Sequence, residues 1–184
     1  MKNKVAVVVL LMMAAVSAQA QLVNSSFETA GAQEDLAEGW SRWGDWMNRE
    51  SVWTPVKDGT CLIGYHHWQI EKSDNSGLYQ DMKVTAGQNY TFSVYANADN
   101  SADSKNAETV ELRLETAVNG SQSTVASKIY NHSDIASGTD WSKLQISAVA
   151  PNEDLRALIV ITPSKEGPRG GSLKFDAAEL TAGQ

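Results

Sequence analysis

The 184-residue sequence contains a single cysteine, Cys61, and only three histidines. One cysteine cannot form an internal disulfide, so the fold must depend on its hydrophobic core. The shortage also excludes a cysteine-based zinc site and leaves few ligands for a histidine-rich one. Common catalytic signatures are absent too, since there is no Gly-x-Ser-x-Gly elbow and no His-Glu-x-x-His motif.

Basic residues are in short supply, at 15 against 22 acidic ones, and the formal net charge is −7. Residues 1–20 hold two of the basic residues and none of the acidic ones, so the rest of the chain is more acidic still. Binding to nucleic acid requires a basic surface that neutralises phosphate groups. The charge balance therefore excludes nucleic acid as a partner.

Long apolar runs are also lacking, apart from residues 5–16, which are preceded by lysines and followed by Ser-Ala-Gln-Ala. This arrangement predicts a secretory signal peptide over residues 1–20, with cleavage after Ala20. The run is shorter than the ~20 residues that cross a bilayer, so we expect no membrane span. Residues 21–184 have the size of a single domain. We expect this domain to be secreted or periplasmic, and monomeric.

Helical periodicity is lacking after Ala20, and polarity instead alternates from one residue to the next, as in half-buried strands. The predicted strands cover residues 22–28, 60–71, 77–84, 88–98, 108–117, 123–130, 141–149, 155–162 and 172–180. Many short strands separated by turn residues predict an all-β fold, an antiparallel β-sandwich of the jelly-roll type. The segment 29–59 is long for a connection in a compact domain, and such connections are usually functional.

Several short motifs occur in the same order as in one known family. They are Val23 to Glu28 with the pair Gly39-Trp40, Ser76 to Gln80 followed by Val84 to Ser93, Asp140 to Leu144, and Leu173 to Asp176. Together they resemble carbohydrate-binding modules with a galactose-binding-like jelly roll. The resemblance implies a non-catalytic module that binds a polysaccharide or an oligosaccharide. It also implies a structural Ca²⁺ ion held by Glu28 and Asp176, whose carboxylates are the oxygen ligands that calcium prefers.

Tryptophan is concentrated in one part of the chain, with five of the six residues between positions 40 and 68. Aromatic rings stack on the apolar faces of sugars, so such a cluster in a long loop indicates a sugar-binding surface. We expect Trp40, which follows a glycine at a family core position, to be buried. The tryptophans predicted to contact the ligand are Trp43, Trp46 and Trp53.

The predicted strand 60–71 supplies further candidates. Its apolar residues Leu62 and Ile70 are predicted to face the core, which directs Tyr65 and His67 to the opposite surface. The side chains predicted to line one shallow face there, and to hydrogen-bond the ligand, are Tyr65, His67, Tyr95, Arg113 and Gln145. Their charges fit a neutral glycan as well as a uronate.

Three other functions are compatible with these residues. Tyr65, His67 and Arg113 on one sheet would suit proton abstraction beside a uronate carboxylate, as in a small polysaccharide lyase. A glycosidase needs two placed carboxylates, for which Glu111 and Glu115 are the candidates. The remaining alternative is a structural or adhesive matrix protein without a sugar site.

Overall fold

The structure is a computed structural model that describes residues 21–44, 47–66, 75–98, 108–163 and 172–183. The predicted signal peptide lies outside these ranges, as do two of the predicted ligand residues, Trp46 and His67. No helix within the described ranges is long and apolar enough to cross a membrane.

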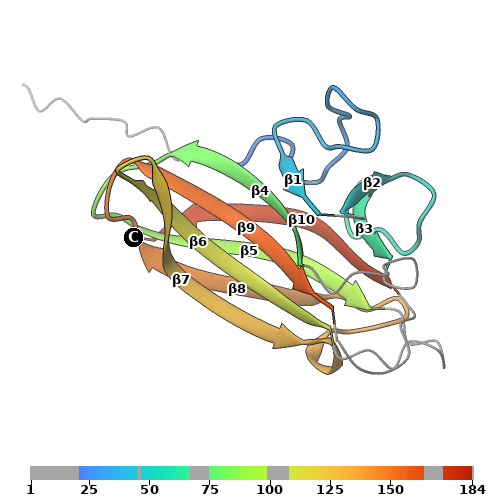
Figure 1. Cartoon of the computed structure of the whole chain (residues 1–184). Helices are drawn as coiled ribbons and strands as arrows, with labels where there is room; N and C mark the ends of the chain where they lie inside the picture. Colours follow the sequence, from blue (N-terminus) through green and yellow to red (C-terminus); the bar gives the residue numbers. More distant parts are fainter. Residues whose placement is uncertain (1–20, 45–46, 67–74, 99–107, 164–171, 184) are drawn as a thin grey trace, which may run out of the picture.

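The described residues form two antiparallel sheets that pack face to face (Figure 1). The strands are β1 (Ser41–Trp43), β2 (Asn48–Glu50), β3 (Leu62–His66), β4 (Ser76–Lys83), β5 (Asn89–Ala98), β6 (Thr109–Val118), β7 (Ser121–Asn131), β8 (Ser142–Val149), β9 (Asp154–Thr162) and β10 (Ser172–Ala182), with a 3-10 turn η1 (His132–Asp134) before β8. The sheet with strand order β1-β4-β9-β6-β7 is named sheet I, and the sheet with order β2-β3-β10-β5-β8 is named sheet II. The predicted β-sandwich is confirmed.

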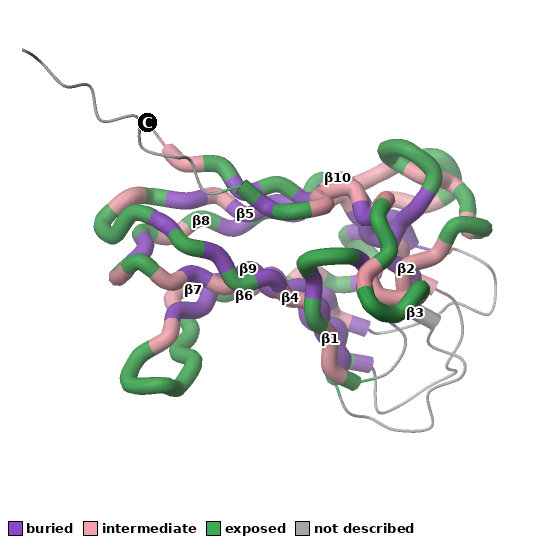
Figure 2. The backbone as a smooth tube through the Cα atoms, turned by 90° about the horizontal axis from the view of Figure 1, so that it is seen from above, coloured by how far each residue is buried: buried purple, intermediate pink, exposed green. Residues whose placement is uncertain are grey.

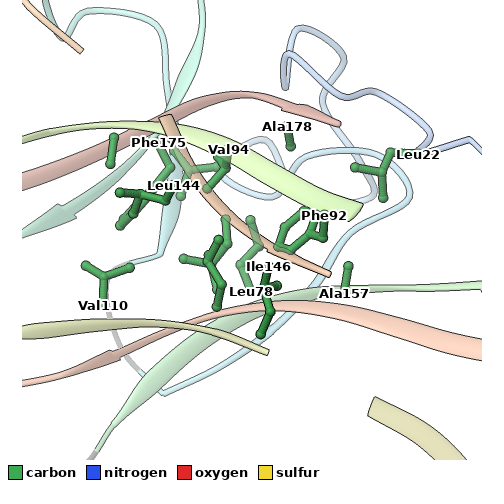
Figure 3. Close-up of a cluster of buried hydrophobic side chains, with 14 of the residues drawn as sticks. Leu22, Leu78, Phe92, Val94, Val110, Leu144, Ile146, Ala157, Phe175 and Ala178 are labelled. Atoms are coloured by element: carbon green, nitrogen blue, oxygen red, sulfur yellow. The ribbon is translucent and has the colours of Figure 1, made fainter. Parts of the chain in front are cut away.

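The hydrophobic core lies between the two sheets, where buried positions of both layers face each other (Figure 2). The alternation that marked the strands in the sequence supplies these side chains. Figure 3 shows part of the core, including Leu78, Phe92, Val94, Val110, Leu144, Ile146, Ala157 and Phe175. Trp40 is 3% exposed and its ring centroid lies 5.2 Å from that of Phe27, so its predicted burial is confirmed.

The predicted strand 22–28 is wrong, because this segment is a series of turns. Asn24 and Phe27 have positive φ angles of 51° and 60°, which interrupt an extended strand. Conversely, β1 and β2 are short strands within the predicted connection 29–59.

Side chains replace strand pairing in this first segment. The buried Gln80 on β4 accepts a hydrogen bond from the Val23 N–H at 2.7 Å and donates one to the Val23 carbonyl at 3.0 Å. The Trp40 indole N–H also donates to the Val23 carbonyl, at 3.2 Å. The side-chain amide of Gln80 therefore pairs with both main-chain polar groups of Val23, as a neighbouring strand would.

We expect Gln80→Leu to destabilise the protein by about 1–3 kcal/mol, because it leaves the Val23 N–H without its partner and removes one of the two donors to the Val23 carbonyl. Urea unfolding measures the change. Gln122→Leu, at an exposed position of β7, is the matched control and should have little effect. Equal losses for the two variants would contradict the role assigned to Gln80.

Candidate functional site

The predicted ligand residues Tyr95 and Arg113 lie on opposite sides of the sandwich. Tyr95 is on β5 in sheet II and Arg113 is on β6 in sheet I. Each alternates with core residues, so each points outward from its own sheet. Gln145 pairs with Ser93 on the outer side of sheet II. The prediction of one continuous face is therefore wrong.

Tyr65 does not reach a surface. It is fully buried in the core together with Ile63, whereas Leu62 and Gly64 point to the outer side of sheet II. The predicted assignment of the two faces of this strand was thus reversed. Since Tyr65 is buried in sheet II and Arg113 belongs to sheet I, the arrangement expected for a lyase is not formed.

The segment 51–61 covers part of the outer side of sheet II. The half-buried Trp53 lies against Gly64, since a Cβ atom there would come within 2.6 Å of the indole ring. Further along, the Lys57 ammonium lies 4.4 Å from the centroid of the Tyr95 ring. Trp53 and Tyr95 therefore both contact groups of the protein itself.

A hollow of about 550 Å³ opens beside Tyr95 on the same side of the sandwich. Its lining consists of Gln21, Leu22, Ser25, Tyr95, Lys143 and residues 177–181. Lys143 points its ammonium at Glu179, 3.4 Å away, and lies 5.8 Å from the Tyr95 ring centroid. The hollow is thus lined by the aromatic ring of Tyr95 and by the ion pair between Lys143 and Glu179.

The outer face of sheet I carries two aromatic residues side by side. The Trp43 ring on β1 lies across Gly77 of β4, where an added Cβ atom would be 2.0 Å from the indole. Its centroid is 5.9 Å from that of Tyr79, with 44° between the ring planes. The Trp43 N–H donates to the Asn75 side-chain oxygen at 3.3 Å. Gly77 therefore allows the indole to lie flat on the sheet at its edge.

Tyr79 was missed in the sequence as a site residue. It alternates with the buried Leu78 and Gln80, so the same alternation that predicted strand 77–84 also placed it outward. Without the strand order, nothing in the sequence brings Tyr79 next to Trp43.

The middle of this face has a layer of apolar side chains beneath its larger residues, which we name the apolar floor. Leu158 and Val160 on β9 are 3% and 1% exposed, although they alternate with core residues and point away from the core. In the sheet register, Leu158 lies between Tyr79 and Arg113. Larger neighbours on the same face therefore cover the floor.

The charges on the face occur in pairs. Arg113 donates two hydrogen bonds to Glu111, at 2.6 and 3.1 Å, and one to Glu115 at 3.2 Å. Arg156 binds Asp81 in the same two-pronged way, at 2.6 and 2.8 Å, and its guanidinium lies 4.0 Å from the Tyr79 ring centroid. Hydrogen bonding to Glu111 raises the pKa of Arg113 above its usual value, and hydrogen bonding to Asp81 raises the pKa of Arg156.

The two residues predicted to bind calcium, Glu28 and Asp176, both accept hydrogen bonds from the segment 51–61. Glu28 accepts hydrogen bonds from the N–H groups of Thr60 and Cys61, at 2.9 and 2.8 Å, and from the Thr60 hydroxyl at 2.8 Å. Asp176 is fully buried and accepts from the N–H groups of residues 57 and 58, at 2.8 and 2.9 Å, and from its neighbour Ala177 at 2.6 Å.

Calcium needs six to eight oxygen ligands, whereas the groups aimed at the Glu28 and Asp176 carboxylates here are hydrogen-bond donors. The calcium site stays a prediction. Among the residues that the structure describes, no group of three or more acidic, histidine or cysteine side chains could hold a metal.

Comparison with known proteins identifies the fold. No protein-family model and no curated protein matches the chain. The solved structure of TmCBM61 in complex with β-1,4-galactotriose is 14% identical with a TM-score of 0.60, and the match covers 87% of this chain and 96% of that one. The CBM22-1 xylan-binding domain from Paenibacillus barcinonensis Xyn10C is 15% identical with a TM-score of 0.51, over 85% and 90% of the two chains.

The chain therefore has the β-sandwich fold of carbohydrate-binding modules, as its motifs predicted. The same fold is shared with an apo cyclase from Fischerella sp., which is 17% identical with a TM-score of 0.60 over 91% of this chain and 98% of that one. Because one fold serves different functions, the function has to be argued from the surface itself.

We expect the stability of the protein to fall as the pH rises from about 4 to about 6. Desolvation raises the pKa of Asp176 from 3.8 to about 6, despite three N–H donors, so the folded state holds a proton there that the unfolded state has lost. The contribution is at most about 3 kcal/mol. Unfolding free energies measured across this range should show it.

Asp176→Asn removes the titratable group. The difference in unfolding free energy between the wild type and this variant therefore isolates the contribution of Asp176. Asp140→Asn, at an exposed position, is the control and should preserve the wild-type profile. A difference between wild type and Asp176→Asn that is constant with pH, or that grows as the pH rises, would contradict the prediction.

Proposed function

We propose that this protein is a secreted module that binds a polysaccharide or an oligosaccharide through the outer face of sheet I. Secretion follows from the signal peptide predicted over residues 1–20. Trp43 and Tyr79 form the aromatic part of the binding surface, and Glu111, Arg113 and Glu115 offer hydrogen bonds to sugar hydroxyls.

One observation carries this proposal: the Trp43 indole lies flat over Gly77 beside Tyr79, on a sheet face with an apolar floor. A ring that is half-exposed and parallel to the sheet presents its free side to a sugar ring. Stacking on that side uses large apolar area at little cost in conformational entropy. The fold is also that of TmCBM61 and CBM22-1, which bind galactotriose and xylan.

The charge pairs favour a neutral glycan over a uronate. Arg113 and Arg156 already bind three carboxylates, Asp81, Glu111 and Glu115. A uronate carboxylate would approach three negative groups and two arginines already engaged with them, whereas a neutral hydroxyl can donate to any of the carboxylates. β-1,4-Galactan and xylan are therefore the first ligands to test.

We expect Trp43→Ala and Tyr79→Ala each to weaken glycan binding by about 1–3 kcal/mol, because each removes a stacking surface. Calorimetric titration with galactan and xylan oligosaccharides measures the loss, and urea unfolding checks that the variants remain folded. Tyr95→Ala is the matched control, since it removes an aromatic ring from the opposite side. If Tyr95→Ala abolishes binding and Trp43→Ala does not, the ligand binds at the hollow on sheet II.

We expect binding to a neutral glycan to be nearly independent of salt, because no net charge is brought together. Affinity electrophoresis in gels containing galactan, xylan or polygalacturonate, at low and high ionic strength, tests this. Tighter retention by polygalacturonate at low salt would show that the ligand is a uronate and that the charge pairs open to receive it.

A further inference from the structure

The outer edge of β8 is bonded to a side chain of the other sheet. β8 is an edge strand of sheet II and β7 is an edge strand of sheet I, and the two lie on the same side of the sandwich (Figure 1, Figure 2). The hydroxyl of Tyr130 on β7 accepts a hydrogen bond from the Gln145 N–H at 2.9 Å and donates one to the Gln145 carbonyl at 2.7 Å. One side chain thus binds both main-chain polar groups of a residue in the middle of β8.

These two main-chain groups point away from sheet II. Gln145 belongs to the antiparallel pairing of β8 with β5, in which every second residue directs its N–H and carbonyl away from the partner strand. Since the Gln145 groups bind Tyr130, the residues Lys143, Ser147 and Val149 have the same outward phase. Such a row of outward groups is the surface on which a further strand pairs.

The core holds the Tyr130 ring in place beside this edge. Its cross-strand partner on β6 is the buried Val110, and the half-buried ring packs against the hydrophobic core. The Lys128 ammonium lies 4.7 Å from the ring centroid. A tyrosine in such a place keeps its ring among apolar groups while its hydroxyl reaches a polar partner.

β8 has few of the other features that protect an edge strand. Such strands are usually very short, carry several charges or a proline, or contain a bulge. β8 has eight residues with one charge, at Lys143, and no proline, and its pairing with β5 has no register shift over the residues that the structure describes. The Tyr130 side chain is therefore the main protection of this edge.

The same edge is complementary to a second copy of itself. In an antiparallel pairing about a two-fold axis at Gln145, outward residues meet outward residues, and Lys143 of one copy lies opposite Ser147 of the other. Like charges directly opposite each other would destabilise such a pair, and here none are opposed. A two-fold contact of this kind closes as a dimer.

We propose that the outer edge of β8 is a self-association surface of this protein, and that Tyr130 masks it by taking the place of a partner strand at Gln145. With Tyr130 in place, a second copy has to displace its two hydrogen bonds and its ring before the edges pair. Without it, the Gln145 groups bind the β8 edge of another molecule. This edge lies outside the outer face of sheet I, so its role does not depend on glycan binding.

The first experiment opens the edge and measures the oligomeric state by sedimentation velocity over a range of protein concentrations. Tyr130→Val keeps an apolar contact with the core but is too short to reach Gln145. We expect its dimer fraction to rise with concentration, while the wild type stays monomeric. Val110→Ala, which loses packing at the cross-strand position but keeps the hydroxyl, is the control and should stay monomeric. A monomeric Tyr130→Val protein, or equal association of the wild type or the control, would overturn the proposal.

The second experiment tests whether the association uses the edge. Adding Gln145→Pro to Tyr130→Val removes the central outward N–H, and a proline there blocks a further strand while the pairing with β5 is kept. We expect the double variant to be monomeric at concentrations where Tyr130→Val is a dimer. A double variant that still forms dimers would overturn the proposal, because the contact would then lie elsewhere.

Hydrogen exchange provides the test if Tyr130→Val does not fold. Tyr130→Phe removes the hydroxyl alone, so the ring is no longer tied to β8. We expect the Gln145 amide to exchange roughly tenfold faster in dilute protein, the effect of one lost hydrogen bond, and to regain protection as the concentration rises. Tyr90→Phe, which removes a hydroxyl bonded to the Thr85 N–H, is the control and should change neither. Unchanged exchange at Gln145, or faster exchange at every concentration, would overturn the proposal.

Discussion

The packing of residues 51–61 onto sheet II rests on two carboxylates that accept main-chain N–H groups. Asp176 binds residues 57 and 58, and Glu28 binds residues 60 and 61. These bonds are charge-assisted and therefore stronger than bonds between neutral groups. They fix a segment without regular strand structure against a sheet, and that segment brings Trp53 onto Gly64 and Lys57 onto Tyr95.

This packing makes the two sides of the sandwich different. On sheet II, part of the outer side is covered by residues 51–61, and the nearby aromatic rings contact the protein itself. Within the part of the chain that the structure describes, the outer face of sheet I is covered only by its own side chains, which pair their charges and leave Trp43 half-exposed. A β-sandwich has two outer faces on which a ligand could bind. Because the outer side of sheet II is partly covered here, we propose the outer face of sheet I as the binding face.

The sequence predicted the strands well because most of them are buried on one side only. Alternation then shows directly which residues face the core, as in β6 and β8. It failed for β3, where Leu62 is buried on the outer side of sheet II while Ile63 and Tyr65 are buried in the core. A strand buried on both sides has no polar face, so its phase cannot be obtained from polarity.

Alternation also cannot say to which sheet a strand belongs. β5 and β6 follow each other in the chain but lie in different sheets, which places Tyr95 and Arg113 on opposite sides although both were correctly predicted to face outward. Sheet membership depends on pairings between distant segments, such as β4 with β9. For the same reason Tyr79, 36 residues from Trp43, was not expected beside it.

The tryptophan cluster shows the converse limitation: residues that are close in the sequence can lie on different sides of the molecule. Trp43 and Trp53 are ten residues apart, and each lies on a glycine whose missing side chain makes room for the ring. Yet Gly77 belongs to sheet I and Gly64 to sheet II, so the two indoles lie on different sides of the molecule. Trp40 is in the core between them. The three tryptophans of the cluster that the structure describes thus have three different surroundings. Of these three, Trp43 at the edge of sheet I has the geometry for stacking on a sugar.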